Sequence, residues 1–399
     1  MILHFTFPYY YISCNKQRNK FKKVMKEEIK MKRAAAAAIS LMTGLAMLAG
    51  CSRAEVEETI QPLVADAIEE SDSEAEAVKE EDESPLIPEI DTDIKIHAGS
   101  RIAVVSKCVK GEYWKMVKKG MEDAVKEINK AYGYKKDDQI TMTFEGPDNE
   151  EDVETQINTI DAVIAENPDV LCISASDMDS CEAQLEAAKE NGIPVIAFDS
   201  NVAEKKLVKA YRGTDNVQVG KMAAYQLGSA LGKMGKVAVF SAQQKTKSVQ
   251  DRVEGFMNNI GKYGDIEVVE TIYSDQVDDM EASMKEVLEK YPTLDGVFCT
   301  NADITEMYLN LEKSDEHDAP ALVGVDATTK QQEAIRNGEE IGCVSQQPYA
   351  MGYQTIWAAV ETTAPKKSVV IEKNVLSNPA WIDADCLDDP DYSGYLYTE

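Results

Sequence analysis

From about residue 100 onward, short apolar runs alternate with longer segments of helical periodicity. Each run is only a few residues long, which is too short for a buried helix and typical of a strand covered on both faces. Between the runs, apolar residues recur every three or four positions, which predicts amphipathic helices. The predicted strands are RIAVVS, ITMTFEG, DVLCISAS, IPVIAFD, VKAYRG, KVAVFSA, IEVVETIYS, DGVFCTN, ALVGVD and IGCVSQQ.

This alternation predicts an α/β protein with parallel sheets. About nine successive strand–helix units imply right-handed crossovers and helices on both faces of each sheet. A span of roughly 300 residues exceeds what a single core usually holds, which favours two doubly wound parallel-sheet lobes over one sheet. A closed β/α barrel is the structural alternative, although it requires eight units around one core.

Polar side chains stand where several predicted strands end. In doubly wound sheets, ligands bind at the carboxyl ends of the strands, so these positions are candidates for a site. An arginine near the start of the helix after VAVFSA and two aromatic residues that open the first helix belong to the same region. The candidate ligand-binding residues are Tyr113, Trp114, Asp199, Arg252, Asn301, Asp326 and Gln346.

Together these candidates suit a neutral polyol. Carboxylates and amides bind hydroxyl groups, a guanidinium donates in a fork, and aromatic rings pack on the apolar face of a sugar. Structural roles remain open as alternatives. Asp199 and Asp326 could cap the following helices, Arg252 could form a surface salt bridge, the two aromatic residues could belong to the core, and Gln346 could simply end a strand.

The first fifty residues have the features of a secretory signal. Lys32 and Arg33 precede the apolar stretch AAAAAISLMTGLAMLAG, which ends in small residues. Its last three residues with the following cysteine, LAGC, resemble a bacterial lipobox and predict lipidation, for example by palmitate, at Cys51. A short transmembrane anchor is the alternative. A start at Met31 would give a conventional signal, which leaves residues 1–30 in question.

An acidic segment follows the signal. Residues 52–93 contain 16 Asp and Glu residues, few aromatics and three prolines, a composition that cannot bury enough apolar surface to order itself. We therefore expect residues 51–98 to form a disordered tether, with a short acidic helix as an option within it.

Charge and composition exclude several classes of partner and site. The net charge is −29, and the chain from Cys51 onward carries 33 basic and 69 acidic residues, which disfavours nucleic acid and anionic membrane surfaces. The three histidines are scattered and the eight cysteines form no C-x-x-C pair. We expect no metal and no cofactor. We expect no disulfide either, because a strand and the helix that follows it rarely bring two cysteines within bonding reach, as for Cys172 and Cys181, the closest pair in sequence.

Several segments, in order and spacing, resemble the type I periplasmic sugar-binding proteins of the ribose-binding branch. These segments are NPDVLCISASDMDSCEAQLEAAKENGIPVIAFDS, GTDNVQVGKMAAYQLGSALG, QDRVEGFMNNI, DGVFCTNAD, ALVGVDATT and GCVSQQPYAMGYQTI, and the resemblance covers about residues 100–385.

The resemblance implies two lobes that close around one sugar and are joined by three crossing strands. The crossings would fall near Thr214-Asp215, Gln346-Gln347 and Leu376-Ser377. The N-terminal lobe would then comprise residues 99–214 and 348–376, and the C-terminal lobe residues 215–347 and 377–399.

The resemblance also implies residues of the cleft, and it shows where this chain differs. It places Asp199, Arg252, Asn301, Asp326 and Gln346 in the cleft, the residues that the strand ends also indicate. The loop 107–112 lacks the Asn and Pro-Phe-Phe usual in ribose binders, and Ser200 stands where that branch often has Arg. The sugar therefore need not be ribose.

The signal-like N-terminus and the family resemblance together imply a lipid-anchored, exported, monomeric binding protein. By the resemblance, it would capture a monosaccharide or similar polyol and deliver it to an ABC transporter permease at the outer face of the cell membrane. A sensor subunit that presents its ligand to a membrane receptor or kinase is the alternative. We do not expect an enzyme, although Asp199 and Asp326 could in principle serve a glycosidase as acid and base.

Overall fold

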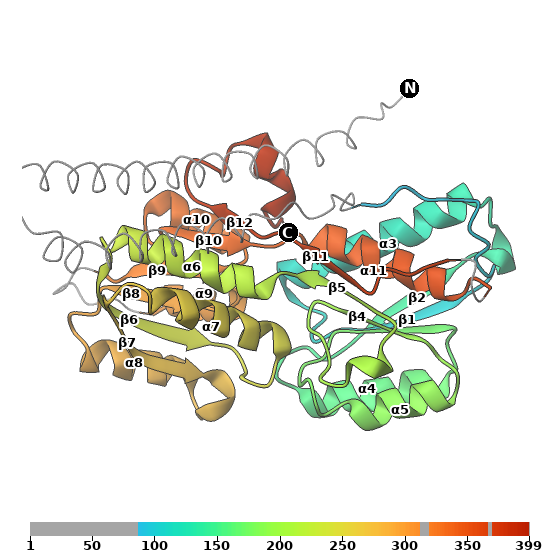
Figure 1. The fold of residues 1–399 in the computed structure, drawn as a ribbon, viewed down its shortest axis with the longest axis horizontal. Coiled ribbons are helices and arrows are strands. Elements are labelled where there is room, and N and C mark those ends of the chain that lie inside the picture. Colours follow the sequence, from blue (N-terminus) through green and yellow to red (C-terminus); the bar gives the residue numbers. More distant parts are fainter. Residues whose placement is uncertain (1–86, 312–318, 366–368, 399) are drawn as a thin grey trace, which may run out of the picture. The chain divides into compact units, whose positions relative to one another are not determined.

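The computed structural model describes residues 87–311, 319–365 and 369–398, which form two six-stranded sheets (Figure 1). The strand order is β11-β5-β4-β3-β1-β2 in the first sheet and β12-β10-β9-β8-β6-β7 in the second. Neighbouring strands are parallel, except that β12 is antiparallel to β10. The two predicted doubly wound lobes are thus confirmed, and the barrel alternative is excluded.

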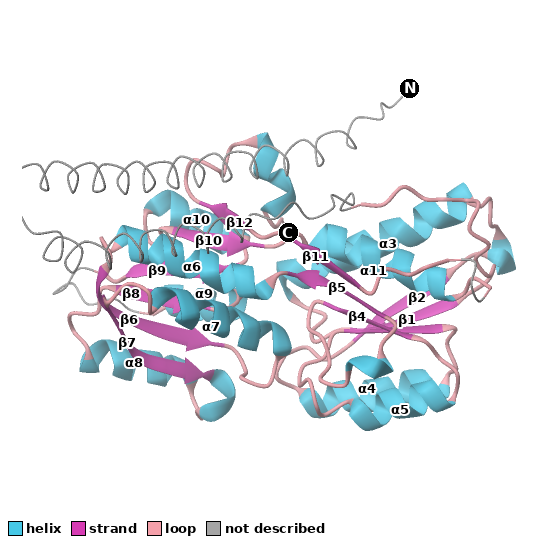
Figure 2. Ribbon diagram, viewed as in Figure 1, coloured by secondary structure: helices cyan, strands magenta, loops and turns pink. Residues whose placement is uncertain are grey.

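The first sheet is covered by helices on both faces (Figure 2). Alternate residues of β1 face opposite sides: Ile102 and Val104 pack with α3 and α11, whereas Ala103 and Val105 pack with α4 and α5. This lobe, called the N-terminal lobe, contains β1 (Arg101–Val105), α3 (Gly111–Ala131), β2 (Thr141–Glu145), α4 (Val153–Ala165), β3 (Val170–Ile173), α5 (Glu182–Glu190), β4 (Val195–Phe198), β5 (Ala210–Thr214), α11 (Pro348–Thr362) and β11 (Asn374–Ser377).

The second sheet forms the core of the C-terminal lobe. Phe256 of α7 stacks on Phe298 of β8, with ring centroids 4.5 Å apart, at the centre of one large apolar cluster. The lobe contains α6 (Asn216–Ala230), β6 (Met234–Ser241), α7 (Lys247–Ile260), β7 (Asp265–Tyr273), α8 (Met280–Lys290), β8 (Gly296–Cys299), α9 (Ala302–Leu309), β9 (Ala321–Val325), α10 (Thr329–Asn337), β10 (Gly342–Ser345), β12 (Ala380–Ile382) and the 3-10 helix η4 (Pro390–Tyr395).

The chain passes between the lobes three times. The passages lie between β5 and α6, between β10 and α11, and between β11 and β12. The third runs from Ser377 to Ala380, slightly later than the sequence resemblance implied. Neither lobe is therefore a continuous piece of chain.

One pair of helices in each lobe packs at unusually close range through glycines. A Cβ on Gly220 of α6 would lie 1.9 Å from the Arg252 carbonyl oxygen of α7, and one on Gly255 of α7 would lie 2.2 Å from the Val217 carbonyl oxygen of α6. Gly120 of α3 and Gly352 of α11 have the same relation in the N-terminal lobe. Only glycine permits these helix–helix distances.

The segment before β1 differs from the composition-based expectation. Residues 87–96 pack along the N-terminal lobe, where Ile87, Ile90 and Ile94 contact its core. The Tyr132 hydroxyl donates to the backbone oxygens of Asp91 and Ile94. Regularly spaced isoleucines among the acidic residues supply the apolar surface for this docking. The remainder of the predicted tether, like the signal region and Cys51, lies outside the described residues.

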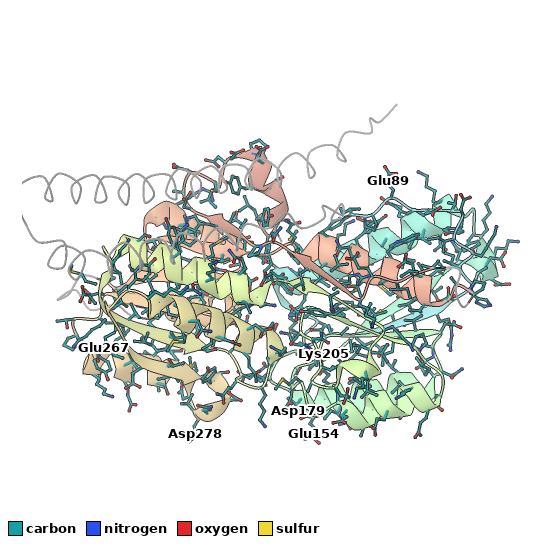
Figure 3. The ribbon with its side chains drawn as sticks, in the orientation of Figure 1. Glu89, Glu154, Asp179, Lys205, Glu267 and Asp278 are labelled. Atoms are coloured by element: carbon teal, nitrogen blue, oxygen red, sulfur yellow. The ribbon has the colours of Figure 1, made fainter. Side chains whose placement is uncertain are left out.

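Acidic side chains extend from the surface of both lobes. Figure 3 shows Glu154, Asp179, Glu267 and Asp278 among the exposed ones. These four carboxylates, all within the described part of the chain, are exposed to solvent.

Glu340 is a carboxyl group buried in the C-terminal lobe, and it leads to a prediction on pH. Its Oε1 accepts from Gln331 Nε2 at 3.3 Å, Oε2 has no partner among the described residues, and burial raises its pKa to about 8. The unfolded chain releases this proton near its ordinary pKa, so raising the pH from about 5 to 8 destabilises the fold. Glu340→Gln should therefore gain stability relative to wild type by about 1.4 kcal/mol per pH unit in this window.

Thermal melts of both proteins between pH 5 and pH 8 measure this gain. Glu339→Gln, which changes the exposed neighbouring residue, is the control and should follow wild type at every pH. A melting-temperature difference between Glu340→Gln and wild type that stays constant with pH would contradict the prediction.

Candidate functional site

Two aspartates occupy equivalent positions in the two lobes. Asp199 follows β4 and Asp326 follows β9, so each lies at the carboxyl end of a central strand. Both have a left-handed backbone conformation, with φ of 55° and 79°, which aspartate tolerates better than most residues. Both side chains are buried, and neither caps the helix that follows its own strand.

The Asp199 carboxylate is held by three side chains of the N-terminal lobe. Oδ1 accepts from the Tyr113 hydroxyl at 2.7 Å, and Oδ2 accepts from Ser174 Oγ at 2.8 Å and lies 3.1 Å from Lys107 Nζ. Burial alone would raise the pKa of Asp199, but the Lys107 ammonium and these hydrogen bonds outweigh it and hold the pKa below its usual range. Asp199 is therefore ionised, and its carboxylate oxygens can accept further hydrogen bonds.

Lys107 is a site residue that sequence reasoning missed. Its ammonium is buried between the carboxylates of Asp199 and Glu150, the latter 3.4 Å away, and lies 5.7 Å from the centroid of the Trp114 ring. Burial lowers its pKa, but the two carboxylates more than compensate, so the pKa is raised overall. Trp114 Nε1 donates to Glu150 at 2.8 Å, which fixes the indole beside this ion pair. The sequence feature that could have identified Lys107 is its position directly after the first predicted strand.

The Asp326 carboxylate is held in a similar way in the C-terminal lobe. Oδ1 accepts from Gln346 Nε2 at 2.7 Å and from the Tyr397 hydroxyl at 2.9 Å, and Oδ2 accepts from the Ala302 backbone N–H at 3.0 Å. The Thr214 hydroxyl, at the first passage between lobes, donates to Gln346 Oε1 at 2.8 Å. Gln346 thus links Asp326 to Thr214 in the first crossing between the lobes, so its role goes beyond ending a strand.

Arg252 lies in the interior of α7, five residues after the helix begins, and not at its start as the sequence suggested. The helix begins earlier because Lys247 and Ser248 already continue its pattern. Nε of Arg252 donates to Asn216 Oδ1 at 2.8 Å and Nη1 to the Thr300 carbonyl at 2.7 Å. No carboxylate among the described residues pairs with this guanidinium, although it is only 4% exposed, so the salt-bridge alternative does not hold. Nη2 has no acceptor within the described residues.

Asn301 has a structural role that the sequence argument did not consider. Its side-chain oxygen accepts from the Ile304 backbone N–H at 3.1 Å and so caps α9. The amide nitrogen is not used by the cap, and Asn301 directly follows Thr300, whose carbonyl accepts from Arg252.

Side chains of both lobes meet around these groups. Gln243 Nε2 donates to the Glu150 carbonyl at 2.7 Å, and the Thr329 backbone N–H donates to Glu112 Oε2 at 2.8 Å. The Tyr113 and Tyr397 rings lie 5.9 Å apart, which connects Asp199 indirectly to Asp326. The structure therefore brings the predicted residues of both lobes to one interlobe region.

The chemistry of this region suits hydrogen bonding to hydroxyl groups. Carboxylates, amides and one guanidinium provide donors and acceptors. Tyr113 and Trp114 provide apolar rings beside them, and both are also buried members of the N-terminal lobe core, as the structural alternative held. Within the described part of the chain there is no cluster of metal-ligating side chains. The six cysteines of that part are buried and free, including Cys172 and Cys181.

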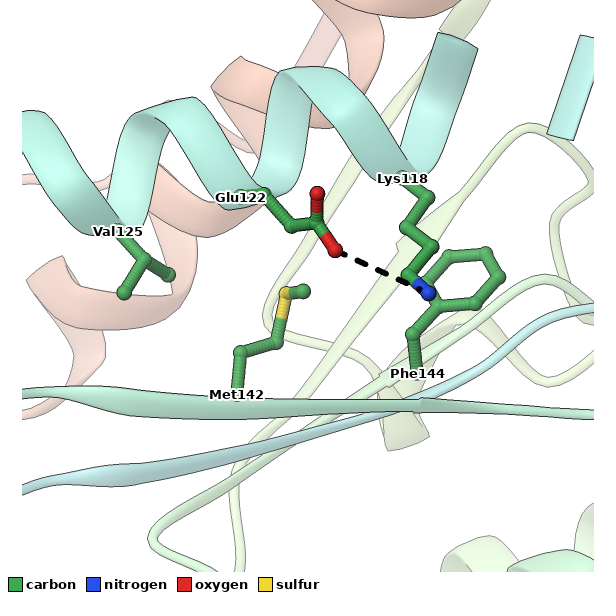
Figure 4. Close-up of a pocket in the computed structure, with 5 residues that line it drawn as sticks. All are labelled: Lys118, Glu122, Val125, Met142 and Phe144. Carbon is green, nitrogen blue, oxygen red and sulfur yellow. Dashed lines mark ion pairs between the residues drawn. The ribbon is translucent and has the colours of Figure 1, made fainter. Parts of the chain in front are cut away.

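A separate pocket of about 280 Å³ lies between α3 and the edge strand β2 (Figure 4). Val125, Met142 and Phe144 form its apolar part, and Lys118 and Glu122 form an ion pair at its edge. None of the predicted ligand-binding residues lines this pocket, so it is distinct from the interlobe site.

None of the helices in residues 87–311, 319–365 and 369–398 is both long enough and apolar enough to span a bilayer.

Comparisons with known proteins show what this chain is similar to. The model of the periplasmic binding protein domain matches residues 102–367. The ribose import binding protein of Bacillus subtilis is 26% identical over 220 residues, which cover 55% of this chain and 71% of that protein. A xylitol-binding protein of Mycolicibacterium smegmatis is 25% identical over 211 residues, covering 52% of this chain and 60% of the relative.

A solved structure extends the comparison to the fold. An ABC transporter solute-binding protein from Agrobacterium vitis, crystallised with bound D-fucose, is 26% identical with a TM-score of 0.67. The match covers 75% of this chain and 100% of that protein, so both lobes are included.

Proposed function

Because this chain belongs to the periplasmic binding protein family, we propose that it is the sugar-binding subunit of an ABC importer. It binds a neutral monosaccharide or similar polyol between its lobes and delivers it to the permease. The ligand-binding residues are Tyr113, Trp114, Asp199, Arg252, Asn301, Asp326 and Gln346, with Lys107 as an addition from the structure.

The observation that carries this proposal is the pair of buried aspartates at equivalent strand ends. Asp199 and Asp326 each retain acceptor capacity after their protein contacts, and the buried guanidinium of Arg252 retains a free donor, Nη2, within the described chain. A polyol offers hydroxyl groups that donate to the carboxylates and accept from the guanidinium. A cationic or apolar ligand would leave the guanidinium unsatisfied.

Relatives favour delivery over signalling or catalysis. They are named as import or binding proteins for ribose and xylitol, which supports an importer subunit more than a sensor for a receptor or kinase. No enzyme activity is part of the proposal, so a bound sugar should be recovered chemically unaltered after long incubation.

A thermal-shift panel tests the proposed function. D-ribose, D-arabinose, D-fucose, D-allose and xylitol are added to the purified protein at increasing concentration. A ligand present at a hundred times its Kd adds about 2.7 kcal/mol of stability, which is easily detected. Titration calorimetry then gives the Kd of each sugar that stabilises. If every member of the panel leaves the melting temperature unchanged, the proposal is contradicted.

The lipobox-like sequence before Cys51 supports anchoring at the extracytoplasmic face of the cell membrane. Cys51→Ala should release the protein from the membrane fraction or leave its signal uncleaved, because the acylated residue is lost. Fractionation and mass spectrometry of the mature N-terminus measure this. Ser52→Ala, one residue later, is the control and should remain in the membrane. An unmodified wild-type chain in the cytosol would argue against the anchor.

A further inference from the structure

The C-terminal segment reaches into the proposed ligand site. Tyr397, the third residue from the end of the sequence, is 0% exposed. Its hydroxyl donates to Asp326 at 2.9 Å, and its ring lies 5.9 Å from the Tyr113 ring of the other lobe. Tyr397 therefore lies between Asp326, a proposed sugar-binding residue of the C-terminal lobe, and Tyr113, an aromatic residue of the N-terminal lobe.

Backbone and side-chain hydrogen bonds fix this segment in place. The Tyr397 backbone N–H donates to the Ala327 carbonyl at 3.0 Å, and Gln332 Nε2 donates to the Tyr397 carbonyl at 2.8 Å. Two residues earlier, the Tyr395 carbonyl accepts from the Ser345 hydroxyl at 2.5 Å. Tyr395 and Tyr397 are thus tied to β10, to α10 and to the loop between β9 and α10.

The two aspartates of the site are each held by a tyrosine hydroxyl, but the tyrosines come from different places. Tyr113 lies in the first turn of α3 and bonds Asp199, whereas Tyr397 lies near the C-terminus and bonds Asp326. The rings contact each other, so the four residues form a continuous row across the lobes. A substituent that extends from a bound sugar toward this row meets the Tyr397 ring.

We propose that Tyr397 is a specificity-determining residue that closes the ligand site beside Asp326 and excludes sugars with a bulky substituent on that side. This inference rests on the proposed function, since it concerns the same interlobe site. Selection by a steric obstacle is a common route to specificity, because it weakens the wrong ligand without new contacts to the right one.

The proposal is tested by removing the Tyr397 ring and offering a ligand whose own phenyl ring can occupy the space. Tyr397→Ala removes a phenol ring, and a space left by a large side chain can accept an aromatic group. The α- and β-phenyl glycosides of D-fucose, D-arabinose and D-allose each carry a ring of similar size next to a sugar. At least one should bind Tyr397→Ala about tenfold or more tightly than wild type, a change of about 1.4 kcal/mol. Binding is measured by calorimetry with the parent sugars alongside.

Two further variants separate selectivity from general packing. Tyr397→Phe keeps the ring and should exclude the phenyl glycosides as wild type does. Tyr392→Ala removes another buried tyrosine of the same segment that contacts neither Asp326 nor Tyr113, and it should not admit them either. If Tyr397→Ala does not fold, Tyr397→Leu, which leaves part of the space open, is measured in the same way.

The outcomes distinguish this inference from the proposed function. Wild type that binds a parent sugar, together with a Tyr397→Ala variant that gains a phenyl glycoside, supports both. Wild type that binds a parent sugar, with unchanged preference in the variants, overturns the role of Tyr397 alone. Wild type that binds none of the parent sugars overturns the proposed function, and the role of Tyr397 with it.

Discussion

Replacing Arg252 by alanine should weaken sugar binding about ten- to a hundredfold, because a hydrogen bond to a charged group contributes ~1.5–3 kcal/mol. The guanidinium is buried without a carboxylate partner among the described residues, and its Nη2 is free there to donate to a ligand hydroxyl. The Kd of a sugar that stabilises the wild-type protein, measured by calorimetry, tests this expectation.

Arg252 also supports the structure, and the design must separate the two effects. Its bonds to Asn216 and Thr300 connect α7 to the start of α6 and the end of β8, so the alanine variant should also melt a few degrees lower. Arg252→Lys keeps a charge but loses the planar fork, and it should recover part of the stability but little of the affinity. Arg336→Ala removes an exposed arginine of the same lobe and is the control. Unchanged affinity in Arg252→Ala, whatever its melting temperature, would refute a ligand-binding role.

Gly220→Ala should lower the free energy of unfolding by about 3 kcal/mol or more, at the upper end of overpacking costs. The new methyl group would lie 1.9 Å from the Arg252 carbonyl oxygen and 2.6 Å from the Phe256 nitrogen, both backbone atoms of α7. Backbone cannot rotate away as a side chain can, so α6 and α7 must separate. Because Arg252 lies at this contact, sugar affinity should fall together with stability.

Denaturant titration with a matched glycine variant measures the effect. Gly264→Ala lies in the same lobe at a position where the added methyl meets no atom within 4 Å, and it should leave stability nearly unchanged. A Gly220→Ala protein as stable as Gly264→Ala would show that the helices can part without cost, contrary to the packing described above.

Much of the fold and part of the site follow from local patterns in the sequence. Short apolar runs predict buried strands. In a parallel sheet, the residue after each run lies at the carboxyl end of its strand, where ligands bind. Asp199, Asp326 and Gln346 could be selected in this way because strand and site are adjacent in sequence. Tyr113 could be selected because it lies in the first turn of the helix after the first strand.

Contacts between segments that are distant in the sequence could not be predicted from such local patterns. Nothing local distinguishes Tyr397 from the other tyrosines near the end of the chain, since its partner Asp326 is 71 residues away. Lys107 resembles an ordinary surface lysine until Asp199 and Glu150 are seen on either side of it. The isoleucines of residues 87–96 were outweighed by their acidic neighbours in composition, although they have the apolar surface to dock.

The three passages between the lobes have a consequence for the order of events during synthesis. The N-terminal lobe needs α11 to cover α3 and β11 to complete its sheet, yet both are made after nearly all of the C-terminal lobe. A nascent chain that ends before residue 348 therefore exposes the apolar face that α11 would cover. Completion of the first lobe must wait for the last part of the chain, which leaves a long interval in which the polypeptide is accessible to chaperones.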